Sequence, residues 1–221
     1  MLFKDHAKER LNEKISKCTD CKLKNNPGPV LGYGSIDADV LFVADTPGAT
    51  EVASGIPFIG KAKNTVVEMI SNAGLKKSEY YLTYLIKHAV TDPASIGTGQ
   101  YSYCLHHLLA EIELINPRII CSMGFYSSQA LIKQYKMEWH VKGLKEMHGN
   151  GMLIPAMIRW KKILRPMMYL VPTWNPASPN KVINMYTKKD SFTIKNIRDY
   201  SKMLFDRANI GKQTTLDIVD N

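Results

Sequence analysis

The chain has 221 residues, of which 45% are hydrophobic and 22% charged, so it is long enough for one sizeable core and ordinary for a globular protein. No run of about 18 apolar residues is present and the N-terminus lacks a secretory signal's apolar segment, so we expect a cytoplasmic protein without a membrane span. The formal net charge of +9 favours a polyanionic partner, nucleic acid first, although a basic surface without a partner has the same composition.

Strand and helix signals alternate along the chain. The charged N-terminal segment, up to residue 18, is typical of an amphipathic helix, and residues 39–44 form a continuous apolar run typical of a buried strand. Residues 61–73 have helical spacing and end at Gly74. We expect further strands at 80–86, 118–124 and from 167, helices at 101–115, 126–133 and 190–208, and a β-hairpin between 135 and 168.

This order of strands and helices predicts an α/β fold, in which a mostly parallel sheet carries helices on both faces. We expect a single domain over residues 1–210 and a frayed tail at 211–221. Ligands of such sheets bind at the carboxyl ends of the strands. Two Pro-rich loops, after Val43 and after Val171, follow such strand ends, and we expect them to face each other across one cleft.

The cysteines suggest a metal site. They are Cys18, Cys21, Cys104 and Cys121. A C-x2-C pair with two further thiols in a cytoplasmic chain suits Zn²⁺ or an iron–sulfur cluster, and the spacing does not distinguish the two. The alternative is that Cys104 and Cys121 are ordinary buried cysteines and only the pair is special.

The histidines show no ligand spacing of this kind. His106 and His107 are adjacent to each other, and His148 is isolated in the sequence. We therefore expect surface or helix-capping roles for these three side chains.

The stretch "LFVADTPGATEVASGIPFIGKAKN", residues 41–64, combines a strand end with an unusual loop. A structural loop needs the Pro47-Gly48 turn, but it does not need an acid and an aromatic residue together. Asp45 and Phe58 are therefore candidates for chemistry, and the alternative is that Asp45 caps the turn while Phe58 lies in the core.

The motif order extends this stretch to most of the chain. A C-x2-C pair is followed by "VLGYGSIDADVLFVADTPGATE", "GIPFIGKA", "YYLTYLIKHAV", two further cysteines and "TWNPASPN". This order resembles the family-4 uracil-DNA glycosylases, the four-cysteine members of the uracil-DNA glycosylase superfamily, over roughly residues 18–180. The resemblance implies a three-layer α/β/α fold with a central four-stranded parallel sheet. It also implies a structural [4Fe–4S] cluster, with zinc as the alternative, on Cys18, Cys21, Cys104 and Cys121.

The resemblance also implies roles for the residues of the two Pro-rich loops. Asp45 would position water at the sugar, Phe58 would stack on the flipped base, and Asn175 would bond the base. The remaining pocket residues are expected to be Ala44, Thr46, Pro47, Gly48 and Tyr84, and the residues expected to contact DNA are Ser178 and Lys181.

Three of these positions depart from the family pattern. Asp45 replaces a Glu and is one methylene shorter, and Asn175 replaces a His and cannot supply a positive charge. Tyr84 replaces the Asn that reads the base, so it either changes the base choice or fills the pocket.

Two functions follow from the resemblance. One is hydrolysis of the N-glycosidic bond of uracil or a related base in single- or double-stranded DNA during base excision repair. The other is that of a catalytically weak or inactive DNA-binding subunit in a replication or repair complex, where other proteins of that complex would be partners. A zinc-stabilised protein unrelated to DNA would leave the loop motifs unexplained.

Overall fold

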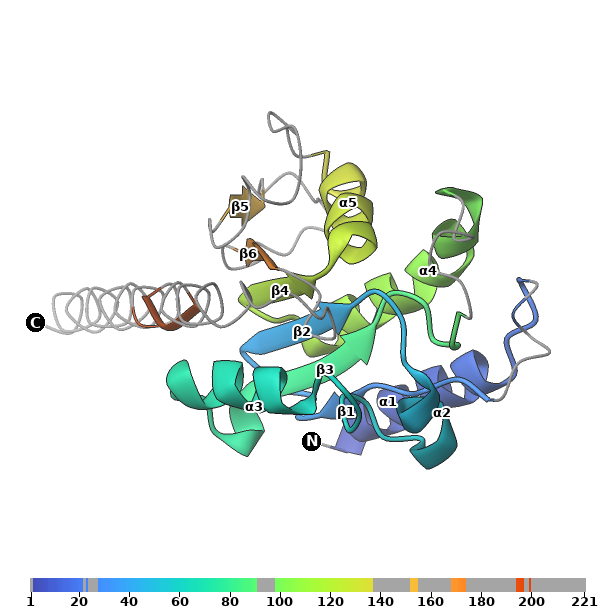
Figure 1. Cartoon of the computed structure of the whole chain (residues 1–221), viewed down its shortest axis with the longest axis horizontal. Coiled ribbons are helices and arrows are strands. Elements are labelled where there is room, and N and C mark those ends of the chain that lie inside the picture. The colour runs from blue at the N-terminus through green and yellow to red at the C-terminus, as the bar shows by residue number, and fades with distance from the viewer. Residues whose placement is uncertain are drawn as a thin grey trace, which may run out of the picture.

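The computed structural model of the chain describes residues 2–21, 23, 28–90, 98–136, 152–154, 168–173, 194–196 and 199. Six strands form one sheet in the order β1-β3-β2-β4-β6-β5 (Figure 1). Their bounds are Tyr33–Gly34 (β1), Val40–Ala44 (β2), Tyr80–Tyr84 (β3), Ile119–Met123 (β4), Met152–Ile154 (β5) and Met168–Thr173 (β6).

The four central strands β3, β2, β4 and β6 are parallel, which confirms the predicted centre of the sheet. The short edge strands β1 and β5 pair antiparallel with β3 and β6, so the sheet as a whole is mixed. The β5–β6 ladder lies partly within the segment where a hairpin was expected. At the other edge, β1 approaches β3 closely at Gly34, where a Cβ would overlap the carbonyl oxygen of Tyr80 and φ is +128°.

Helices cover both faces of the sheet and complete the expected three layers (Figure 1). Alternate residues of each strand point to opposite faces, so a strand contributes to two separate clusters of buried side chains. The helices are Leu2–Ser16 (α1), Ala49–Ser54 (α2), Lys63–Asn72 (α3), Thr98–Ile115 (α4) and Phe125–Gln134 (α5).

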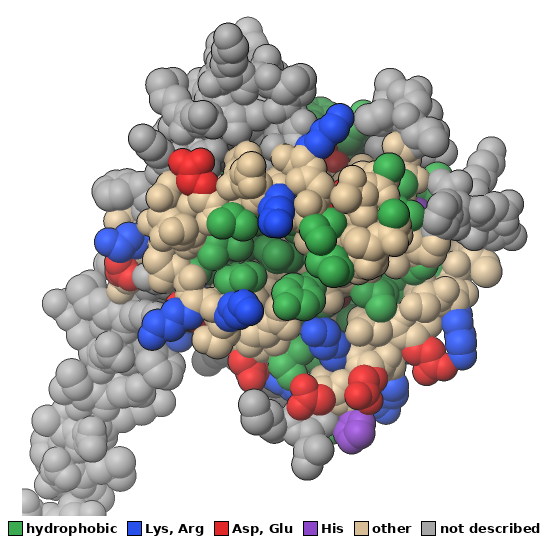
Figure 2. All heavy atoms as spheres, turned by 60° about the horizontal axis from the view of Figure 1, so that its bottom comes forward, with side chains coloured by type: hydrophobic (Ala, Val, Ile, Leu, Met, Phe, Trp, Pro, Cys, Tyr) green, Lys and Arg blue, Asp and Glu red, His purple; other side chains and the backbone are tan. Residues whose placement is uncertain are grey.

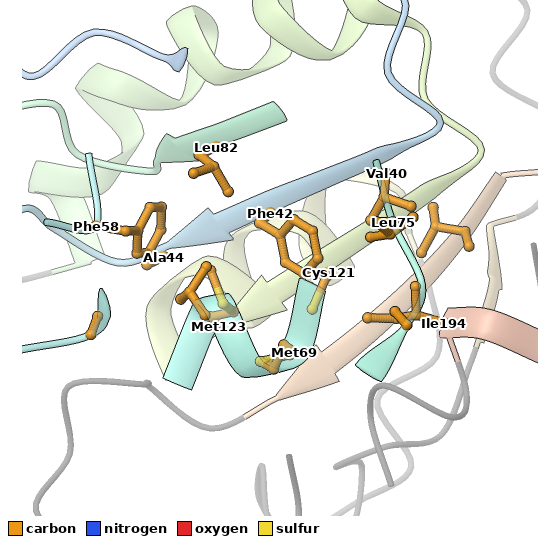
Figure 3. Packing of buried hydrophobic residues seen from close by; sticks show 14 of the residues in the cluster. Val40, Phe42, Ala44, Phe58, Met69, Leu75, Leu82, Cys121, Met123 and Ile194 are labelled. Carbon is orange, nitrogen blue, oxygen red and sulfur yellow. The ribbon is translucent and has the colours of Figure 1, made fainter. Parts of the chain in front are cut away.

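One face, here called the α4 face, packs Leu41, Val43 and Ile120 of the strands against α4 and α5, and α1 packs on the outside of α4. The opposite face, here called the α3 face, packs Val40, Phe42 and Ala44 of β2 against α3 (Figure 3).

The predicted elements within the described residues are present, with ends that differ by a few residues. The short helix α2 differs from the prediction, which has only a loop between Pro47 and Phe58. The expected helix at 190–208 is described only at residues 194–196 and 199, which are helical, and the expected tail lies outside the described residues. Among the described helices, none is both long and apolar enough to cross a membrane.

Candidate active site and metal centre

Asp45 follows β2 directly and lies at the N-terminus of α5. Its side chain is only 8% exposed, and its Oδ1 accepts a hydrogen bond of 2.8 Å from the backbone N–H of Ser127. The side chain therefore caps a helix whose own N-cap, Gly124, has no side chain to do so. Gly124 is required here, because a Cβ would overlap the Asp45 carboxylate and φ is +128°.

The environment of Asp45 makes its carboxyl group a weaker acid than an exposed Asp side chain. Burial raises its pKa from 3.8 to about 6, while the backbone N–H groups of Ser127 and Tyr126 partly oppose this rise. A carboxyl group with this pKa changes its charge near neutral pH, as is common for groups that transfer protons in active sites. Asp45 thus caps helix α5 rather than the Pro47-Gly48 turn of the alternative, and its catalytic role stays a prediction.

Glu51 holds the loop between Asp45 and Phe58 in place. It is 5% exposed, and its two carboxylate oxygens accept hydrogen bonds of 3.1 Å from the N–H of Gly48 and 2.9 Å from the N–H of Gly60. One buried carboxylate therefore ties together the start of α2 and the segment that follows Phe58. No role was predicted for Glu51, although an acid three residues after a helix start is the half of a capping box that accepts from the N-cap N–H.

Phe58 and Tyr84 form a stacked pair at the ends of the loop and of β3. Their ring centroids are 4.8 Å apart with an interplanar angle of 21°, and the side chains are 4% and 2% exposed. The backbone N–H of Phe58 also donates a 2.9 Å hydrogen bond to the Tyr84 hydroxyl, and Phe58 has a positive φ of 58°. One face of the ring expected to stack on a base is therefore covered by Tyr84.

The remaining pocket residues are divided between the core and the surface. Ala44 and Pro47 are buried, Thr46 is half-buried and Gly48 is exposed. Backbone hydrogen bonds from Leu85 to Ala44 and from Ile86 to Asp45 join the ends of β2 and β3. The structure thus brings Asp45, Phe58 and Tyr84 to one end of the sheet. The residues that lie outside those described are Asn175, Ser178 and Lys181.

Three of the four cysteines gather on the α4 face. The thiol of Cys104, on α4, lies near those of Cys18 and Cys21 and near the backbone of Lys87, and burial raises its pKa. Cys18 Sγ, a carboxylate oxygen of Asp20 and a ring nitrogen of His107 lie within 4.8 Å of one another. Cysteine and histidine side chains therefore form a cluster that could hold a metal, and the surface role expected for His107 is wrong, since this side chain is buried.

Cys121 does not join this cluster, so its expected role as a metal ligand is contradicted. It lies in β4 with the same orientation as Ile119 and Met123, on the α3 face, whereas Cys104 packs on the α4 face. Figure 3 shows Cys121 beside Phe42, among the apolar side chains of the α3 face. The sheet separates the two thiols, and Cys121 is a buried core residue, as the structural alternative predicted.

The comparisons with known proteins identify the family. Residues 31–198 match the family described as the uracil DNA glycosylase superfamily. The chain belongs to this superfamily. A Type-4 uracil-DNA glycosylase from Thermotoga maritima is 31% identical over 125 residues, which cover 56% of this chain and 65% of the relative.

Two further relatives carry the same name. The Type-4 uracil-DNA glycosylase from Pyrobaculum aerophilum is 29% identical over 57% of this chain and 64% of its own length. The one from Saccharolobus solfataricus is 27% identical over 75% of this chain and 74% of its own length. The chain thus matches just under two thirds of the length of the relatives from Thermotoga maritima and Pyrobaculum aerophilum.

A buried ion pair connects β3 to α4 beside the metal cluster. Lys87 and Glu111 are each 1% exposed, and the Lys87 ammonium lies 2.5 Å from Glu111 Oε2. The same ammonium donates to Thr83 Oγ1 at 2.7 Å and to the Tyr84 carbonyl at 2.8 Å, and Thr83 donates to Glu111 at 2.9 Å. All three N–H groups of the Lys87 ammonium and the Glu111 carboxylate therefore have hydrogen-bond partners. Buried charges require such partners, because burial removes them from water.

Proposed function

We propose that this chain hydrolyses the N-glycosidic bond of uracil or a related base in DNA, as a step of base excision repair. The observation that carries this proposal is Asp45, a buried carboxyl group at the carboxyl end of a central strand with a pKa of about 6. Ligands of open α/β sheets bind at that end, and a pKa near the working pH suits a group that handles the proton of water.

The reaction explains why a carboxylate is needed at this place. Breaking the bond leaves positive charge on the sugar and negative charge on the departing base. The ionised Asp45 would stabilise the cationic sugar and orient the attacking water, and Asn175 would donate to the base. A donor of this kind typically contributes about 2.7–4 kcal/mol to the stability of a transition state. Base flipping would bring the base to the loop that carries Phe58.

The metal of the cysteine–histidine cluster is, in this proposal, an iron–sulfur cluster of the [4Fe–4S] type. Its contribution is structural, because it would join the loop after α1 to the buried face of α4. Zinc is the alternative, since thiolate and imidazole ligands suit both.

DNA is the proposed partner, and the net charge of +9 supports it. Figure 2 shows a face where hydrophobic side chains gather in the middle, with Lys and Arg side chains among and around them and Asp and Glu side chains at several places along its margin. That mixture does not resemble a phosphate-binding surface. We propose that DNA contacts Ser178 and Lys181, in the segment after β6 to which the family resemblance assigns DNA binding.

A second function is favoured by the stack of Phe58 on Tyr84. If Tyr84 keeps that position in the presence of DNA, a base cannot stack on the covered face of Phe58. The chain would then bind DNA without cleaving the glycosidic bond, as a subunit of a replication or repair complex.

One assay separates the two functions. The full chain is incubated with single- and double-stranded oligonucleotides that carry one uracil, and abasic sites are then cleaved with alkali. Cleavage by the wild type and its loss in Asp45→Asn would support hydrolysis. Salt-sensitive DNA binding without cleavage would reject hydrolysis and support the binding subunit. Cleavage gained in Tyr84→Asn would identify Tyr84 as the block.

A further inference from the structure

The described residues do not fit a metal centre with four cysteine ligands. Cys104 packs on the α4 face of the sheet and Cys121 on the α3 face, with the backbone of β4 between them. Thiolates bind zinc at about 2.3 Å, and the ligands of an iron–sulfur cluster likewise surround one compact group. A group held by Cys104 therefore cannot also reach Cys121, and the cluster needs another fourth ligand.

Two buried histidines lie beside the three remaining cysteines. Nδ1 of His88 and Nε2 of His107 are, within the described part of the chain, buried nitrogen atoms without a hydrogen-bond partner. An unsatisfied buried imidazole nitrogen costs free energy, and a metal ion is one partner that satisfies it. Either ring could therefore be the missing ligand.

The surroundings of the two rings differ. His107 is buried but has polar neighbours: its ring centroid lies 3.9 Å from that of His106, and a ring nitrogen lies within 4.8 Å of a carboxylate oxygen of the exposed Asp20. His107 also lines a surface hollow of about 380 Å³ together with Cys18 and Asp20. A small rotation of Asp20, or a water in this hollow, would supply a partner for its nitrogen.

For Nδ1 of His88, the described residues offer no comparable partner. His88 directly follows Lys87, whose backbone N–H faces the thiol of Cys104, so the chain places His88 beside the most deeply buried thiol of the cluster. His88 is itself buried, at 6% exposure, and its Nδ1 is one of the two buried nitrogen atoms without a hydrogen-bond partner among the described residues. A neutral imidazole is also the form that binds a metal.

We propose that this chain holds its metal centre with three thiolates and one imidazole, from Cys18, Cys21, Cys104 and His88. The centre then ties together three segments: the loop after α1, the first half of α4 and the end of β3. Since Tyr84 ends the same strand, the metal and the aromatic stack are anchored four residues apart.

The arrangement also favours a cluster over a single zinc ion. Tetrahedral zinc would hold its sulfur ligands about 3.8 Å apart, given bonds of about 2.3 Å. The thiols of Cys18, Cys21 and Cys104 do not all lie within 4.8 Å of one another. The identity of the metal rests on the proposed function, whereas the choice of His88 over Cys121 does not.

The test measures the metal rather than DNA cleavage. The full chain is purified without oxygen and reconstituted with ferrous iron and sulfide, or with Zn²⁺ alone in a parallel sample. Iron, acid-labile sulfide and zinc per chain are measured, with circular dichroism as the control for folding. Because loss of an outer-shell partner alone costs about 10- to 100-fold in metal affinity, we expect at least this loss in His88→Ala. Cys121→Ala and His107→Ala are expected to retain the wild-type content.

A second measurement keeps the proposal testable if His88→Ala does not fold. His88→Cys restores four thiolates and is expected to hold a full cluster. Electron paramagnetic resonance of the reduced protein, with ¹⁵N-labelled histidine, should show a nitrogen coupling in the wild type and in His107→Ala, and none in His88→Cys.

The outcomes are distinct. Loss of the cluster in a folded Cys121→Ala variant, or a nitrogen coupling that persists in His88→Cys, would overturn the proposal. Binding of zinc alone, with the same dependence on His88, would support the ligands and reject the iron–sulfur cluster of the proposed function. Failure to cleave DNA would leave all of these readings unchanged.

Discussion

The two faces of β3 are built in different ways. On the α4 face, Tyr81 and Thr83 point into a polar network around the buried pair of Lys87 and Glu111. On the α3 face, Leu82 and Tyr84 lie among apolar side chains, and Tyr84 stacks on Phe58.

The difference shows how one short strand can serve two sites. An ion pair with all its hydrogen bonds made fixes α4, and with it Cys104, in one position, because a buried charge without its partner is very costly. An aromatic stack is held mainly by packing, and a new side chain or a base can replace one of its rings at a lower cost. We therefore expect the metal side to be rigid and the base side to be adjustable.

The largest effect should come from Lys87→Met on the rigid side. This change leaves the Glu111 carboxylate buried without its cation, and such losses typically cost about 3–5 kcal/mol in the free energy of unfolding. Chemical denaturation of the folded chain measures the loss. A double variant, Lys87→Met with Glu111→Leu, should recover part of it. If Lys87→Met alone is as stable as the wild type, the ion pair does not fix this face.

A smaller effect is expected at Asp45, and it depends on pH. The pKa is 3.8 in the unfolded chain and about 6 in the folded one, so the folded chain binds more protons between these values. The free energy of unfolding should therefore fall as pH rises from about 4 to about 6, by about 3 kcal/mol, and stay lower above that range.

Asp45→Asn is the control for this pH dependence, because its amide oxygen can still accept the N–H of Ser127. The variant should lack the fall, so the difference between variant and wild type should grow across the same pH range. Denaturation curves at pH 4, 5, 6 and 7 give this difference. A constant difference would mean that the carboxyl group has an ordinary pKa.

The smallest effect is expected on the adjustable side, from Tyr84→Phe. The change keeps the stacked ring but leaves the backbone N–H of Phe58 without its 2.9 Å hydrogen bond. A buried donor left unsatisfied costs about 1–3 kcal/mol. Thermal or chemical unfolding measures it, and Tyr80→Phe on the same strand is the matched control. A loss larger than that of Lys87→Met would reverse the comparison of the two faces.

The same comparison explains what sequence alone could predict. The four central strands, α3, α4, α5 and the parallel centre of the sheet follow from hydrophobic spacing and turn residues, and all were predicted, whereas the short edge strand β1 was not. Asp45 was placed correctly just after a strand, because it follows the apolar run 39–44, whereas Tyr84 was expected inside the strand 80–86 and in fact ends β3. Their mutual geometry was not predictable, since the stack and the helix cap depend on segments distant in sequence.

The metal ligands show most clearly which contacts the sequence alone could not predict. Alternation along β4 puts Cys121 with Ile119 and Met123, but only the packed fold tells which side of the sheet α4 covers. The local sequence pointed only weakly to these two residues: Glu51 lies three residues after a helix N-cap, and His88 lies just after a strand. Their importance appears only when the hydrogen bonds of the loop and the thiol of Cys104 are in place.

The most direct test of the proposed chemistry is the single-turnover rate of uracil excision as a function of pH. The account predicts that the wild type, or Tyr84→Asn if the stack blocks the pocket, excises uracil at a rate that rises through a pKa of about 6. That rate should be lost when Asp45→Asn is added. Excision at the same rate on both sides of pH 6, or excision that survives Asp45→Asn, would contradict the role given to this carboxyl group.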